Sequence, residues 1–241
     1  MSALAASTEG LGVVVALPAE ARSLGARGLH PGDCARWQQG WLAVSGIGGH
    51  NAMHAAERLL ACGVAALANW GVAGALDASL APGDVLIPEQ IHYAGDDRQG
   101  FAADPAASAY LARQLAGNLH VRRGALWSAA QPVTTAADKR ALAERTGALA
   151  VDMEAAAVAA VAVRAKLPFI ALKAICDPCT REIPPRITHA LDGGGGISIA
   201  MISAILFGGP ASWRAARRLA HDFALARRTL ATAARLVAMP A

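Results

Sequence analysis

"LGVVVAL", residues 11–17, is a continuous apolar run rich in valine that ends at Pro18. An apolar run without alternating polar residues is typical of a strand buried on both faces, as in a parallel or mixed sheet. The pattern returns in three later segments, WLAVSGIGG (41–49), AALANWGVAGAL (65–76) and PFIALKAICD (168–177). We therefore expect several buried strands in one sheet.

Helical segments alternate with these strands, and we expect them near residues 51–62, 107–115, 136–145 and 153–166. This alternation predicts an α/β protein with three layers, in which helices flank a central mixed β-sheet. The sequence contains no linker in its first 190 residues. Residues 1–241 are therefore expected to form a single domain.

A basic amphipathic helix is expected over residues 212–237, after the glycine run at 191–196, as an appendage of this domain. Its basic residues are Arg214, Arg217, Arg218, Arg227, Arg228 and Arg235. Such a helix suits anionic lipid headgroups. The alternative is that it packs its apolar stripe on the domain and exposes its arginines to water. The two interpretations are compatible, and the sequence leaves both open.

Composition narrows the class of protein. The 241 residues are 54% hydrophobic, which is ample for a core, and the longest apolar run (197–207) is about half of what a bilayer requires. The first residues carry no secretory signal, which predicts a cytoplasmic protein.

Four cysteines are too few for a disulfide framework, and CDPC (176–179) lacks two further ligands, so we expect no metal and no redox cofactor. A net charge of +4 argues against specific nucleic-acid binding.

Four polar side chains follow the ends of predicted strands: Glu20, Ser45, Glu154 and Asp177. In layered α/β proteins, ligands gather at the carboxyl ends of the strands. Each residue alone is more often a helix cap or a solvated loop charge. Glu154 is the strongest candidate, because it begins an Ala/Val helix that must be largely buried, and a buried charge needs a partner or a function.

Five ordered segments resemble the nucleoside phosphorylase superfamily, most closely its methylthioadenosine/S-adenosylhomocysteine nucleosidase branch. They are VALPAEA (15–21), SGIGGHNA (45–52), NWGVAGALDASLAPGDVLIP (69–88), AVDMEAAAVA (150–159) and FIALKAICD (169–177). Beyond them, DPCTREIPP (177–185), the glycine run and the Arg-rich helix resemble hopanoid-associated phosphorylases, which are thought to remove adenine from adenosylhopane. The resemblance implies cleavage of the N-glycosidic bond of a 5′-substituted adenine nucleoside, in the second case within hopanoid biosynthesis.

The resemblance also assigns roles to individual residues. Asp177 matches the acid that protonates or hydrogen-bonds N7 of the leaving purine, and burial could keep it protonated near neutral pH. Glu154 matches the carboxylate that binds the ribose hydroxyls, Met153 packs on the sugar, and Glu20 orients the attacking water. The remaining substrate-binding candidates are Ser45, Gly74 and Val133.

Phosphorolysis is the alternative to hydrolysis, with phosphate as co-substrate. It would need an anion site, for which Arg22 and Gly48 are the candidates. A carboxylate beside a phosphate costs electrostatic energy, so Glu20 favours water. Two departures from the nucleosidase branch argue against methylthioadenosine as substrate: Val72 replaces a frequent serine, and AAQPVTT (129–135) replaces an aromatic stretch.

Two further expectations concern partners and activity. The resemblance implies a homo-oligomer, a dimer or larger, and lipid binding by the Arg-rich helix would place the protein peripherally at the inner membrane surface. A catalytically inactive nucleoside-binding or membrane-associated scaffold is the alternative to an enzyme. Retention of Glu20, Glu154 and Asp177 argues against a scaffold, because an inactive relative would be free to lose them.

Overall fold

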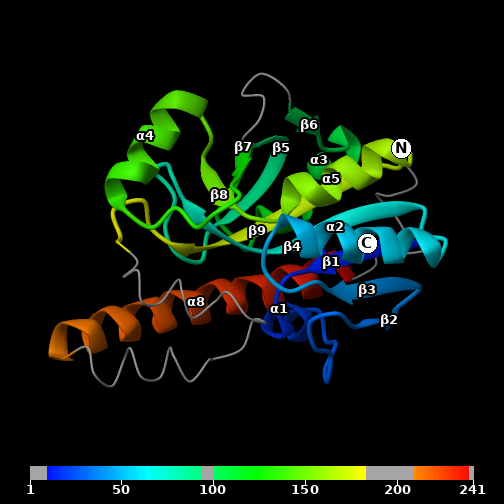
Figure 1. Ribbon diagram of the computed structural model, residues 1–241, viewed down its shortest axis with the longest axis horizontal. Helices are drawn as coiled ribbons and strands as arrows, with labels where there is room; N and C mark the ends of the chain where they lie inside the picture. Colours follow the sequence, from blue (N-terminus) through cyan, green and yellow to red (C-terminus); the bar gives the residue numbers. More distant parts are fainter. Residues whose placement is uncertain (1–9, 94–99, 183–208, 239–241) are drawn as a thin grey trace.

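The computed structural model describes residues 10–93, 100–182 and 209–238, with the side chains of the last segment from residue 217 onward. Nine strands form one mixed sheet with helices on both sides, which confirms the expected fold class (Figure 1). The strands are β1 (Leu11–Val15), β2 (Cys34–Trp37), β3 (Gly40–Val44), β4 (Ala66–Ala75), β5 (Val85–Tyr93), β6 (Gly100–Ala102), β7 (Val121–Ser128), β8 (Ala150–Asp152) and β9 (Phe169–Asp177).

The sheet curls and closes on itself around its centre. β4 pairs with β9, β9 with β5, β5 with β7, β7 with β8, and β8 again with β4. The remaining strands extend this ring, with β1, β3 and β2 following β4 on one side and β6 following β5 on the other. The register of β4 and β9 shifts between Ala73 and Gly74, which places Gly74 opposite Asp177.

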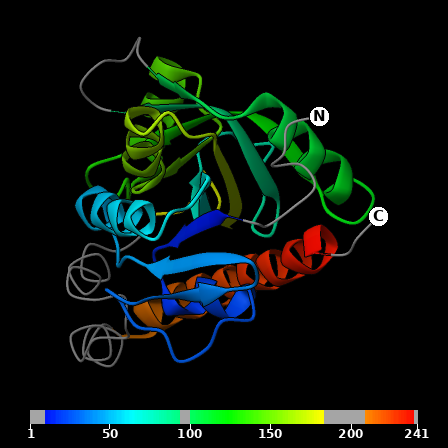
Figure 2. The ribbon, with the colours of Figure 1, turned by 90° about the vertical axis from the view of Figure 1, so that its right-hand side faces the viewer.

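The helices form two layers over the two faces of this sheet (Figures 1 and 2). Helices α2 (Gly49–Ala61) and α5 (Ala155–Arg164) cover one face and share a core with the inward side chains of β1, β4 and β9. Helices α1 (Pro18–Ser23), α3 (Pro105–Leu115) and α8 (Gly209–Ala238) cover the other face. Helix α4 (Ala136–Thr146) lies beside β7 and β8 and contributes to a third, smaller cluster.

Helix α8 is docked on the domain. One side of it is buried against the sheet, including Asp222, Ala226, Thr229, Leu230 and Ala233. This spacing of three and four residues is that of one helical face. Its arginines at 217, 218, 227, 228 and 235 are exposed. The apolar stripe of α8 thus packs on the domain, as one of the two interpretations predicted.

Several expectations fall outside the described residues: residues 183–185 of the segment 177–185, the glycine run at 191–196, the apolar run at 197–207, and the side chain of Arg214. Within the described part of the chain, no helix is both long enough and apolar enough to cross a membrane.

Candidate active site

Glu20 is fixed by the turn between β1 and α1. Its side chain is only 2% exposed. Oε2 accepts hydrogen bonds from the backbone N–H groups of Ala16 (2.8 Å) and Leu17 (2.9 Å), and Oε1 accepts one from Val72 (3.0 Å). A Cβ atom at Gly71 would lie 2.7 Å from Oε1, so glycine is needed there for the carboxylate to approach β4.

This environment makes Glu20 a candidate base. Burial raises its pKa, while the ammonium of Lys173 and the three backbone donors oppose that rise. All three neighbouring backbone groups are donors, and a carboxylate can only accept hydrogen bonds. Glu20 is therefore held in an orientation that suits its ionised form, with lone pairs left for a further donor such as water.

Glu154 is the second buried carboxylate, at the start of α5. Oε1 accepts a hydrogen bond from the backbone N–H of Gly48 (2.7 Å), and Oε2 accepts one from Met153 (3.3 Å). Gly48 has a φ of 98°, a conformation that favours glycine. Burial and the neighbouring charge of Asp152 raise the pKa of Glu154 to about 7. Glu154 can therefore exchange a proton near neutral pH.

Lys173 of β9 is the counterion of this group, and the sequence reasoning missed it. Its side chain is 1% exposed, and Nζ lies 2.6 Å from Oδ2 of Asp152. Burial disfavours the ammonium, but the charges of Asp152, Glu154 and Glu20 together raise the pKa of Lys173 above its ordinary value. The detectable signal was a lysine in the middle of the otherwise apolar strand FIALKAICD.

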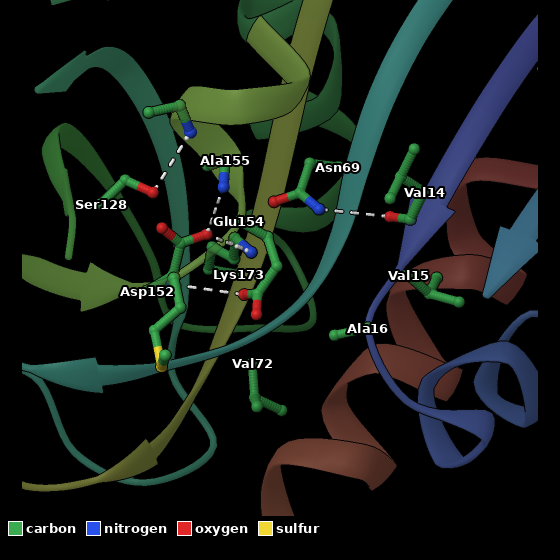
Figure 3. Close-up of polar contacts among 12 residues, drawn as sticks. Val14, Val15, Ala16, Asn69, Val72, Ser128, Asp152, Glu154, Ala155 and Lys173 are labelled. Carbon is green, nitrogen blue, oxygen red and sulfur yellow. Dashed lines mark hydrogen bonds and ion pairs between the residues drawn. The ribbon is translucent and has the colours of Figure 1, made fainter. Parts of the chain in front are cut away.

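Asp152 contacts both the ammonium of Lys173 and the backbone at the start of α5 (Figure 3). Its Oδ2 also accepts a hydrogen bond from the backbone N–H of Ala155 (2.9 Å), which satisfies a donor at the start of α5. Among the described residues, two buried acceptors nearby have no partner, Oδ1 of Asp152 and Oδ1 of Asn69. Buried polar atoms normally bind water or a ligand, so these oxygens suit a ligand that carries hydroxyl groups.

Asp177 ends β9 and is 4% exposed. The ammonium of Lys139 pairs with its Oδ2 and also donates to the carbonyl groups of Pro178 (3.1 Å) and Arg181 (3.3 Å). Lys139, a fully buried residue of α4, therefore places its ammonium group directly against the carboxylate of Asp177. The sequence reasoning missed this partner.

Cys176 connects Asp177 with the rest of the site. Its thiol donates to Oδ1 of Asp177 (3.4 Å). Burial raises the pKa of this thiol, the charge and hydrogen bond of Asp177 raise it further, and the ammonium of Lys139 opposes the rise. Gly74 also borders Asp177, because a Cβ atom there would lie 3.0 Å from Oδ1.

Three expected residues are not joined to these carboxylates by any hydrogen bond or ion pair in the described structure. The hydroxyl of Ser45 donates to backbone carbonyls of its own turn and of β1, and Val133 packs in the smaller cluster beside Trp127. Arg22 is exposed and lines a cavity of about 600 Å³ between α1, α8 and the sheet, whereas the N–H of Gly48 is bound by Glu154.

Metal-ligating side chains are not grouped in the described part of the chain. No three His, Cys, Asp or Glu residues there could share a metal ion, and the four cysteines are free thiols.

The sequence profile of the phosphorylase superfamily matches residues 35–194. This chain belongs to the phosphorylase superfamily. Among solved structures, the 5′-methylthioadenosine/S-adenosylhomocysteine nucleosidase of Neisseria meningitidis with methylthio-immucillin-A is similar at a TM-score of 0.66 and 19% identity, over 95% of this chain and 99% of that one. The expected superfamily is thereby confirmed.

Two other solved structures share the fold. A mutant of the corresponding Helicobacter pylori nucleosidase, with 5′-methylthioadenosine in its active site, has a TM-score of 0.64 and 21% identity, over 81% of this chain and 97% of that one. The futalosine hydrolase of Helicobacter pylori has a TM-score of 0.60 and 19% identity, over 88% and 97%. At these identities the likeness concerns the fold.

Proposed function

We propose that this protein is an enzyme that hydrolyses the N-glycosidic bond of a 5′-substituted adenine nucleoside. The observation that carries the proposal is the pair of buried carboxylates, Glu20 and Glu154, each held by backbone N–H groups around the ammonium of Lys173. Membership of the phosphorylase superfamily supports cleavage of this bond. The similar nucleosidases and futalosine hydrolase support hydrolysis.

The proposed reaction uses three groups on the two sides of the sugar. The bond between C1′ and N9 breaks while the oxygen of water bonds to C1′, through a transition state with positive charge on the ribose. Glu154 accepts hydrogen bonds from the ribose hydroxyls, and Glu20 accepts a proton from the water. The Asp177–Lys139 pair holds a proton that it passes to N7, so that the base leaves as neutral adenine.

The charges of the site favour water over phosphate. Glu20, Glu154 and Asp152 surround a single ammonium group, and a phosphate placed among them would be repelled. Of the two candidates for a phosphate site, the backbone N–H of Gly48 already donates to Glu154, which leaves it unavailable to a phosphate. Phosphorolysis of the same or another purine nucleoside is the second candidate.

The finer proposals concern the 5′ group and the surroundings of the protein. We infer that the substrate is adenosylhopane, which would give ribosylhopane and adenine, on the resemblance of residues 177–185 and of the Arg-rich helix. The exposed arginines of α8 suit contact with an anionic lipid surface. We also propose that the protein is a homo-oligomer and that it is located in the cytoplasm.

The test is release of adenine from adenosylhopane and from methylthioadenosine, each with and without phosphate, with the sugar product identified by mass. Free ribosylhopane formed independently of phosphate is the expected result. Strict dependence on phosphate with a phosphorylated sugar product would make the enzyme a phosphorylase. The Asp177→Asn variant should lose about 100-fold or more of kcat with its fold intact. Near-normal turnover by that variant would remove Asp177 from the role of acid.

A further inference from the structure

A series of polar contacts connects α8 with the candidate acid. Asp222 is 7% exposed although it is charged, and its Oδ2 pairs with Nη1 of Arg181. Arg181 lies four residues beyond Asp177, in the turn where its backbone N–H donates to the carbonyl of Pro178 (3.1 Å). The buried carboxylate of α8 therefore anchors the turn that follows β9.

The same turn holds the ammonium of Lys139. Lys139 has three N–H donors, and its acceptors are Oδ2 of Asp177 and the carbonyls of Pro178 and Arg181. Two of the three acceptors thus belong to the turn and one is the acid itself. The position of the ammonium against Asp177 depends on where the turn lies.

Helix α8 is a rigid support for this turn. The hydroxyl of Thr229 donates to the carbonyl of Gly83 (2.8 Å), between β4 and β5, and Ala226, Leu230 and Ala233 are fully buried. These contacts fix the helix two turns beyond Asp222. Asp222 is therefore presented to Arg181 from a docked element.

We propose that Asp222 is a positioning residue for Asp177, acting through Arg181 and Lys139. The inference rests on the proposed function, in which Asp177 protonates the leaving base. Loss of the Asp222 carboxylate would release the Arg181 side chain and the turn. The two carbonyl groups of that turn that accept hydrogen bonds from Lys139 would then no longer be held in place. A shift of about 1 Å in a catalytic group is enough to lower turnover by about 100-fold.

The experiment compares two leaving groups in the Asp222→Asn variant. Adenine needs a proton as it leaves, whereas 4-nitrophenolate, from 4-nitrophenyl β-D-ribofuranoside, does not. We expect kcat for the adenine nucleoside to fall by about 10-fold to 100-fold, with less than about 3-fold loss on the nitrophenyl riboside and little change in KM. The control is Glu144→Gln, at an exposed position of α4, the helix that carries Lys139, which should keep wild-type rates with both substrates.

A double-mutant cycle provides the second measurement. If Asp222 acts through Lys139, Asp222→Asn combined with Lys139→Gln should be no slower on the adenine nucleoside than Lys139→Gln alone. Independent, multiplying losses would overturn the inference, as would an equal loss on both leaving groups or no loss in Asp222→Asn. Absence of adenine release by the wild-type protein would instead contradict the proposed function itself.

Discussion

Replacing Glu154 by glutamine should make the protein more stable at alkaline pH. In the folded protein, burial and the charge of Asp152 raise the pKa of Glu154 from its ordinary value of 4.5 to about 7. Between these two values the folded state keeps a proton that the unfolded state has lost. Raising the pH through this window therefore removes the proton at a cost to the folded state alone, and stability falls.

The size of the effect follows from the two values. At about 1.4 kcal/mol for each pH unit between 4.5 and about 7, full ionisation of Glu154 costs the folded state about 3 kcal/mol. Glutamine keeps the shape and an oxygen that can accept from Gly48, but it never ionises. The Glu154→Gln variant should thus match the wild type near pH 4.5 and exceed it by about 3 kcal/mol at pH 8, or roughly 6–12 °C in Tm.

The assay is urea unfolding of the two proteins at intervals from pH 4.5 to 8.5. Glu144→Gln, a change at an exposed glutamate of α4, is the matched control and should stay within about 0.5 kcal/mol of the wild type throughout. The reasoning is refuted if the stability difference between Glu154→Gln and the wild type does not grow with pH. A variant that is less stable than the wild type at pH 8 would also refute it.

The other predictions concern the neighbours of Glu154. Gly71→Ala should displace the Glu20 carboxylate from the backbone of β4, because the new methyl carbon would lie 2.7 Å from Oε1 of Glu20. Steady-state kinetics should then show about a 100-fold loss of kcat, while circular dichroism should show an unchanged fold. Lys173→Met should lower the free energy of unfolding at pH 8 by about 3–5 kcal/mol, since it leaves Asp152 without its buried counterion; an unchanged urea midpoint would contradict this. The kcat/KM for the nucleoside should rise with pH up to about 7 and then level off, because the carboxylate of Glu154 is the form that accepts ribose hydroxyls; a flat profile from pH 5 to 9 would argue against that role.

The buried strands could be predicted from the sequence because their apolar runs leave little choice of structure. β1, β4 and β9 lie within three of the four runs that the pattern indicated, β3 begins one residue before the fourth, and α5 lies within its expected segment. The runs did not include β2, β5, β6, β7 or β8. The burial of β2 and β7 is partial, so polar residues such as Arg36 and Arg122 interrupt the apolar pattern.

The site was only partly predictable. Acidic residues at strand ends indicated Glu20, Glu154 and Asp177. Of the two ammonium groups beside them, Lys173 interrupts an apolar strand and could have been noticed, whereas Lys139 could not. Lys139 belongs to a polar helix, AADKRALAERT, where a lysine is typical of the surface, and only the turn after β9 encloses it. Contacts between residues so far apart in the chain depend on tertiary packing, which a single sequence does not display.

Closure of the sheet into a ring has a consequence for the protein at high concentration. In the described part of the chain, the free edges of the sheet belong to β2 and β6, which are only four and three residues long. β2 also carries Arg36, whose guanidinium stacks 4.7 Å above the ring of Trp41. Short, charged edges are poor templates for strand addition by another molecule. Each long strand of the ring, β4, β5, β7 and β9, also has a partner strand on each side for part of its length, which leaves less of its backbone available to another molecule.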